Sequence, residues 1–140
     1  MTRRLRVLFV DDDVDLLAGV RLGLRKAPYE IFTANSADEA AAVLLENTVD
    51  VVVSDERMPE VAGSRFLGFV HRNFPNTVRI ALTGQASLDA VKRAVNEGGI
   101  SRLLTKPCSP EEIASAITES FQERVASATA TLKADAEAQL

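Results

Sequence analysis

Five short apolar runs alternate with five segments of helical periodicity along this chain, and this alternation limits the folds that it can adopt. The expected strands are Leu5–Val10, Tyr29–Thr33, Val49–Ser54, Val78–Leu82 and Ile100–Leu104. Between them, apolar residues recur at the three- and four-residue spacing of helices. Strands that alternate with helices form a parallel sheet with right-handed crossovers and helices on both faces. We therefore predict a doubly wound α/β fold with five strands and five helices.

Several helix starts carry their own signals. Asp13 follows the first strand and can cap a helix with its carboxylate. Ser36 and Glu39 form an S-x-x-E capping box at the start of the second helix. Pro110 opens the last helix at a position where its missing N–H costs nothing. These signals place the helices in the segments between the strands.

Composition is that of one globular domain. The chain has 140 residues, of which 46% are hydrophobic and 26% charged. The net charge of −4 argues against nonspecific binding to nucleic acid or to an anionic membrane. The chain has one cysteine, which fits a reducing compartment, and lacks a run of apolar residues long enough to span a bilayer. The early apolar run is too short for a signal peptide, so we expect a cytoplasmic protein.

The residues that could take part in binding or catalysis follow the ends of the strands. Asp11 and Asp12 follow the first strand, Asp55 the third, Thr83 the fourth and Lys106 the fifth. In a parallel sheet these ends lie at one edge, where ligands bind in open α/β folds. Three carboxylates at one edge repel one another, and a hard cation such as Mg²⁺ relieves that repulsion.

The same edge has what phosphoryl transfer requires. Lys106 supplies a mobile cation for a phosphate oxygen, and Thr83 supplies a hydroxyl donor. A carboxylate that acts as nucleophile toward phosphorus, with Mg²⁺ neutralising the charge, gives an aspartyl phosphate. The pattern therefore indicates Mg²⁺-dependent phosphoryl chemistry at this edge.

Four motifs in this order resemble the receiver domains of bacterial two-component response regulators. They are VDDD at Val10–Asp13, D-x-x-M-P-x-x-x-G at Asp55–Gly63, LTG at Leu82–Gly84 and TKP at Thr105–Pro107. The resemblance spans Arg6 to about Gln122. It implies the flavodoxin-like form of the doubly wound sheet, with strand order 2-1-3-4-5.

By position, the resemblance also implies roles for the edge residues. Asp55 would be the phosphoacceptor. Asp12, Asp55 and the backbone carbonyl of Arg57 would bind Mg²⁺ directly, and Asp11 would act through water.

The remaining roles concern the phosphoryl group itself. Thr83 would be the switch hydroxyl, and Lys106 would bind phosphate and precede a cis peptide to Pro107. Similar receivers carry an aromatic residue three positions before the lysine, where this chain has Leu103. Leu103 cannot hydrogen-bond and is smaller than a ring, so we expect little rotamer locking at this position.

The resemblance implies a phosphoacceptor signalling switch. A sensor histidine kinase or phosphotransfer protein would donate phosphate to Asp55. Partner binding would then change on the face formed by the fourth helix, fifth strand and fifth helix, for an output domain or protein. The chain would not be an enzyme beyond catalysing its own phosphorylation and slow dephosphorylation.

Two other functions share these residues. The first is a phosphatase-type hydrolase that forms an aspartyl phosphate. Such enzymes need an acid at the position of Arg57 and an additional cap over the substrate. A pseudo-receiver that works without phosphorylation is the other, and it is disfavoured because every catalytic position is filled.

Residues 1–122 are expected to form the receiver domain, and residues 123–140 a helical extension or linker without an output domain. The tail has six alanines and neither glycine nor proline. Phe121, Val125, Ala128 and Leu132 are spaced like a short coiled-coil seam. A homodimer through this helix and a plain linker are both open interpretations.

Overall fold

The computed structural model describes residues 4–58, 61–84 and 87–139. Pro59, which belongs to the motif after the third strand, lies outside the described residues. The strands are β1 (Leu5–Val10), β2 (Tyr29–Ala34), β3 (Val51–Asp55), β4 (Val78–Thr83) and β5 (Arg102–Thr105). The helices are α1 (Val14–Gly23), α2 (Ala37–Glu46), α3 (Gly63–Asn73), α4 (Leu88–Gly98) and α5 (Pro110–Gln139). Strands and helices alternate as predicted.

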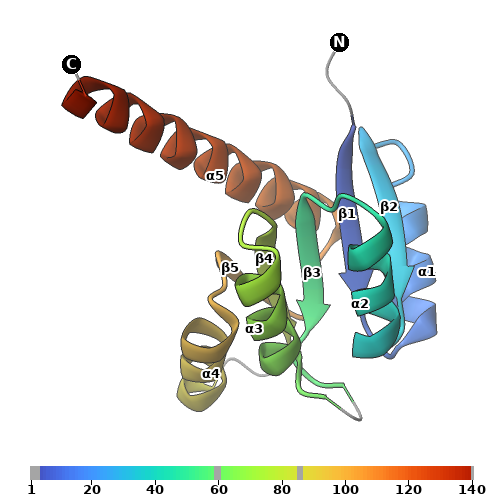
Figure 1. Ribbon diagram of the computed structural model, residues 1–140. Helices are drawn as coiled ribbons and strands as arrows, with labels where there is room; N and C mark the ends of the chain where they lie inside the picture. The colour runs from blue at the N-terminus through green and yellow to red at the C-terminus, as the bar shows by residue number, and fades with distance from the viewer. Residues whose placement is uncertain (1–3, 59–60, 85–86, 140) are drawn as a thin grey trace.

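The sheet has the predicted order, β2-β1-β3-β4-β5, with every pair of neighbours parallel (Figure 1). Strand β3 lies between β1 and β4, and all of its residues are buried. Asp55, the last residue of β3, pairs in register with Leu82 of β4. The carboxyl ends of the strands therefore lie side by side, at the lower edge of the sheet in Figure 1.

Two cores fill the space between the sheet and its helices. Helices α1 and α5 pack on one face with Val51 and Val53 of β3. Helices α2, α3 and α4 lie on the other face with Val52. This division follows from the alternation of side chains along a strand, because successive residues point to opposite faces. Helix α4 packs mainly against α3 rather than against the strands.

The capping signals of the sequence have clear structural counterparts. The carboxylate of Asp13 accepts hydrogen bonds from the N–H groups of Asp15 and Leu16 at the start of α1. The Ser36 hydroxyl accepts from the N–H of Glu39 at 3.1 Å, as a capping box requires. The return contact differs, because the Glu39 carboxylate accepts from the N–H of Asn35 at 3.4 Å.

Helix α5 continues without a break past the domain, through the segment expected to be a helical extension (Figure 1). Its first half packs on the sheet through Ile113 and Ile117. Farther along, Val125 is 48% exposed and Leu132 is 70% exposed. Phe121, the first residue of the seam, packs against the core, whereas Val125 and Leu132 are not covered by their own domain. None of the described helices has the length and hydrophobicity that crossing a bilayer requires.

Gly63 lets α3 begin directly beneath the end of β3. Its N–H donates to the carbonyl of Glu56 at 2.8 Å. A Cβ at this position would lie 1.9 Å from the backbone oxygen of Asp55, which is far inside van der Waals contact. Only glycine allows this approach, so the residue supports the loop that follows Asp55.

We predict that Gly63→Ala lowers the free energy of unfolding by about 1–3 kcal/mol, because the new methyl group must displace backbone atoms. Gly19→Ala is the matched control, since Gly19 is an exposed residue of α1 with no atom within 4 Å of an added Cβ. That change should raise the free energy of unfolding by about 0.5–1 kcal/mol. Urea unfolding measures both. Equal stability of the two variants would contradict the packing described for Gly63.

Candidate functional site

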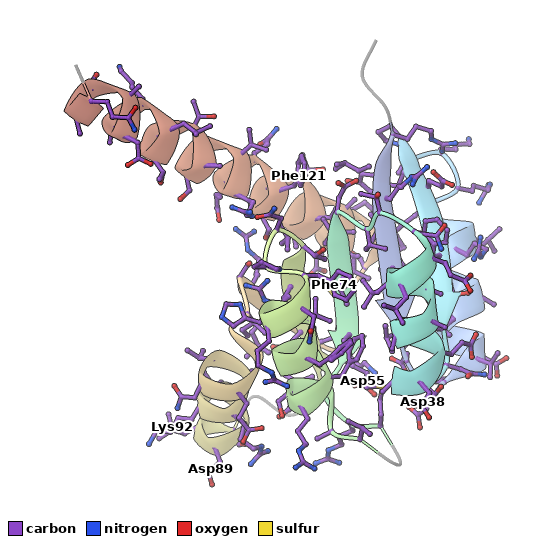
Figure 2. The ribbon with its side chains drawn as sticks, viewed as in Figure 1. Asp38, Asp55, Phe74, Asp89, Lys92 and Phe121 are labelled. Atoms are coloured by element: carbon purple, nitrogen blue, oxygen red, sulfur yellow. The ribbon has the colours of Figure 1, made fainter. Side chains whose placement is uncertain are left out.

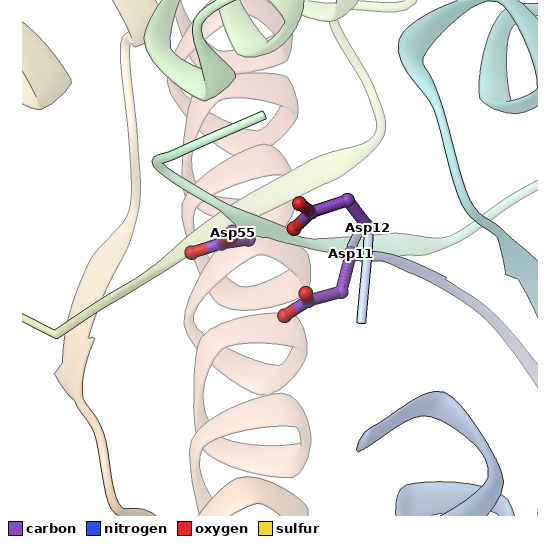
Figure 3. A group of neighbouring side chains, drawn as sticks. All are labelled: Asp11, Asp12 and Asp55. Carbon is purple, nitrogen blue, oxygen red and sulfur yellow. The ribbon is translucent and has the colours of Figure 1, made fainter. Parts of the chain in front are cut away.

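Three carboxylates gather where β1 and β3 end (Figure 3). Asp11 and Asp12 follow β1 directly, and Asp55 closes the neighbouring β3. Each offers a carboxylate oxygen, and these oxygens lie within 4.8 Å of one another. Asp11 and Asp55 are buried, whereas Asp12 is exposed. The parallel register thus brings together the acids that the sequence placed at one edge.

Lys106 reaches this acidic cluster from the end of β5. Its Nζ lies 3.0 Å from Asp11 Oδ2 and 3.3 Å from Asp55 Oδ1. Its own N–H donates to the carbonyl of Thr83 at 2.8 Å, which continues the sheet beyond the last residue of β5. The peptide bond between Lys106 and Pro107 is cis. One ammonium group therefore joins two of the three carboxylates.

The charges in the cluster shift the titration of its members. Burial raises the pKa of Asp55 above its ordinary value, and the charge of Asp11 raises it further, although Lys106 opposes both. Burial alone would lower the pKa of Lys106, but its hydrogen bond and charge interaction with Asp11, together with those with Asp55, raise it overall. The ammonium is thus held in its charged form, whereas the negative charge on Asp55 remains poorly compensated.

Thr83 ends β4 and is almost completely buried. Its hydroxyl donates to Glu56 Oε2 at 2.9 Å. The other carboxylate oxygen of Glu56 lies 3.5 Å from Nη2 of Arg93 on α4. The motifs in the sequence assign no role to Glu56. An acid immediately after a buried strand was the available signal, but its partner depends on the register of β3 and β4.

Arg57 and Leu103 complete the set of positions that the sequence singled out. The backbone of Arg57 hydrogen-bonds to Asp55, while the arginine itself is exposed. Leu103 lies in β5 and is partly buried against the core shared with α2, α3 and α4. An aliphatic side chain at this position packs as core and has no polar atom to offer to the site.

The family model for the response regulator receiver domain matches residues 7–118. The chain belongs to this family. The hydrogenase transcriptional regulatory protein HoxA of Cupriavidus necator is 34% identical over 116 residues, which are 83% of this chain and 24% of HoxA. The transcriptional regulatory protein GlrR of Escherichia coli is 36% identical over 118 residues, or 84% of this chain and 26% of GlrR.

Solved receiver structures agree with the fold. The signal receiver domain of an HD domain-containing protein from Pseudomonas fluorescens Pf-5 has a TM-score of 0.85 and 32% identity, over 92% of this chain and 95% of that one. A CheY-like receiver domain from Methanospirillum hungatei JF-1 has a TM-score of 0.83 and 27% identity, over 89% and 98%. The receiver thus matches whole receiver structures, but it spans about a quarter of the length of HoxA and GlrR.

The pKa of Asp55 generates a stability prediction for the receiver in the presence of a chelator. When folding raises the pKa of a carboxyl group, the free energy of unfolding of the protein falls as the pH rises from the pKa in the unfolded state to the pKa in the folded state. At pH 7, Asp55→Asn should therefore raise the free energy of unfolding, because the substitution removes a buried negative charge. The gain should shrink as the pH falls toward the ordinary carboxyl value. A variant less stable than the parent at pH 7 would show that the charge on Asp55 is well compensated.

Proposed function

We propose that this receiver is a phosphoacceptor switch that takes a phosphoryl group on Asp55 from a histidine kinase or a phosphotransfer protein. The observation that supports this most strongly is the position of Lys106, whose ammonium lies within 3.3 Å of both Asp11 and Asp55. A cation held beside a buried carboxylate is placed to pair with a phosphoryl oxygen once that carboxylate is modified. A solvated surface lysine would not be held beside a buried carboxylate in this way.

The acidic cluster fits a divalent cation of the Mg²⁺ type. Its donors are hard carboxylate oxygens within 4.8 Å of one another, and Mg²⁺ prefers such ligands while keeping several waters. Asp12, Asp55 and the backbone carbonyl of Arg57 would hold the ion, with Asp11 acting through water. When bound, Mg²⁺ neutralises negative charge on the transferred phosphoryl group.

The protein groups divide the transfer among them. A carboxylate oxygen of Asp55 attacks phosphorus, a new O–P bond forms, and the bond between phosphorus and the donor atom breaks. Lys106 exchanges part of its contact with the carboxylates for a phosphoryl oxygen. Thr83 then donates its hydroxyl to another phosphoryl oxygen. The chemistry is limited to phosphorylation of the receiver itself and slow loss of the group.

An apolar pocket beside Lys106 supports docking of a donor protein. The pocket opens between α1 and α5, next to the acidic cluster. Its lining includes apolar side chains from both helices and from the segment after β5: Leu16, Val20, Pro107, Cys108 and Ile113. An apolar surface at the mouth of a charged site lets a partner bury contact area while its phosphorylated side chain reaches Asp55.

The output surface is proposed to be the face of α4, β5 and α5. Leu88 and Val95 of α4 are 69% and 53% exposed, so the helix presents apolar area that a partner could cover. Residues 1–122 would form the switch in the cytosol, and the tail from 123 would lead to or bind the output. HoxA and GlrR are transcriptional regulators, while the Pseudomonas fluorescens receiver comes from an HD domain-containing protein. Similar receivers therefore serve different outputs.

Incubation with Mg²⁺ and acetyl phosphate should add one base-labile phosphoryl group to the receiver. Asp55→Asn should abolish the addition, because an amide cannot act as the nucleophile. Asp12→Ala should weaken Mg²⁺ binding, as measured by titration, because one ligand is lost. Asp38→Ala, at an exposed acid of α2 (Figure 2), is the control and should leave both unchanged. Undiminished labelling of Asp55→Asn would refute the assignment.

We also propose that the exposed seam of α5 pairs with the same helix of a second chain. Leu132→Glu places a charge in the seam, so it should convert a dimer at tens of micromolar into a monomer in sedimentation experiments. Ala130→Glu puts the same charge on an exposed position outside the seam and should leave the dimer intact. A parent chain that sediments as a monomer at this concentration would leave the tail as a linker.

A further inference from the structure

Glu56 has no role in the phosphoryl transfer proposed above. It follows Asp55 directly, and its side chain is only 9% exposed. Its carboxylate accepts the Thr83 hydroxyl at 2.9 Å in a buried hydrogen bond. Among the described residues, it lies outside the acidic cluster formed by Asp11, Asp12 and Asp55. Its contacts therefore lead to the switch hydroxyl and not to the cation site.

A hydroxyl has one proton, so a strong hydrogen bond to one acceptor competes with donation to another. In the structure, Thr83 donates to a carboxylate, which is a stronger acceptor than a neutral group. Before Thr83 can donate to a phosphoryl group on Asp55, it must release Glu56. The two acceptors, one on each of two successive residues, thus compete for a single donor.

The backbone around Glu56 is fixed on both sides. Its N–H donates to the carbonyl of Leu82 at 2.9 Å, and its carbonyl accepts from Gly63 at 2.8 Å. Thr83 is likewise held through its carbonyl by the N–H of Lys106. Release of Thr83 from Glu56 is therefore a side-chain event at the carboxylate and the hydroxyl.

Arg93 connects this exchange to α4. Its Nη2 lies 3.5 Å from Glu56 Oε1, while the arginine side chain is 53% exposed. Glu56 thus has two partners, one on β4 and one on α4. Because α4 packs mainly on α3, a change in this ion pair acts on a helix that is weakly attached to the sheet.

We propose that Glu56 is a positioning residue that holds Thr83 in the unphosphorylated arrangement and opposes the switched one. Phosphorylation of Asp55 takes the Thr83 hydroxyl from Glu56, and the altered carboxylate changes its contact with Arg93 and hence the position of α4. This inference rests on the proposed function, because it concerns how the phosphoryl group at Asp55 is sensed.

The test is a double-mutant cycle that measures the affinity for beryllofluoride, a phosphoryl mimic, in the presence of Mg²⁺. Glu56→Gln keeps the shape but offers Thr83 a weaker, neutral acceptor, so beryllofluoride should bind roughly tenfold more tightly. Removal of a negative charge near an anion would also tighten binding. Thr83→Val separates the two causes, because the charge effect persists without the hydroxyl whereas competition for it disappears.

In the Thr83→Val background, Glu56→Gln should therefore change the affinity by less than about twofold. An equal gain in both backgrounds would overturn the proposal and leave Glu56 acting through its charge alone. Glu97→Gln is the matched control, since Glu97 also accepts from a hydroxyl, that of Ser64, and loses the same charge. Thermal unfolding checks that each variant is folded. If Glu56→Gln does not fold, Glu56→Ala takes its place in the cycle.

Amide exchange tests the connection to α4 without any phosphoryl mimic. Glu56→Gln and Arg93→Gln should each speed exchange in residues 88–98, whereas Lys92→Gln, at an exposed neighbour, should not. Unchanged exchange in the first two variants would refute the connection. A parent receiver that takes neither beryllofluoride nor phosphate would refute the proposed function itself. Normal binding by the parent without coupling between Glu56 and Thr83 would refute only the role of Glu56.

Discussion

The contacts of Lys106 with Asp11 and Asp55 are the interaction on which the site depends. Two buried carboxylates beside a third would repel one another, and the ammonium at 3.0 and 3.3 Å offsets much of that repulsion. Burial and, after it, the charge of Asp11 still raise the pKa of Asp55 above its ordinary value. Such a site favours a further cation, which is what the proposed phosphoacceptor role of Asp55 requires.

The parallel sheet makes this arrangement possible. Because β3 is buried between β1 and β4, its last residue lies beside residues that are distant in the sequence. Gly63 allows α3 to begin against the backbone of Asp55, so the loop after β3 stays close to the sheet edge. Helix α4 has its main contacts with α3, and Glu56 and Arg93 give it a polar connection to the site. The sheet thus holds the charged residues of the site, and α4, which is less firmly packed, lies on the proposed output face.

The fold and most of the site could be predicted from the sequence, because the topology of a parallel sheet determines where its strands end. Alternating strands and helices bring Asp11, Asp55, Thr83 and Lys106 to one edge whatever the details of packing. The role of Glu56 could not be predicted in the same way, since its contact with Thr83 depends on the register of two strands and on a side-chain rotamer. The tail was ambiguous for a similar reason. Helical propensity predicts that it is a helix, but only tertiary packing shows that Val125 and Leu132 remain exposed.

The central claim is that Asp55 carries the phosphoryl group, and chemical trapping tests it most directly. Borohydride reduces an aspartyl phosphate to homoserine, which peptide mass spectrometry can locate to a single residue. After treatment with acetyl phosphate and Mg²⁺, the account predicts homoserine at position 55 and at no other acid of the chain. Homoserine at position 11 or 12, or an unmodified position 55 in a protein that has taken up phosphate, would contradict it.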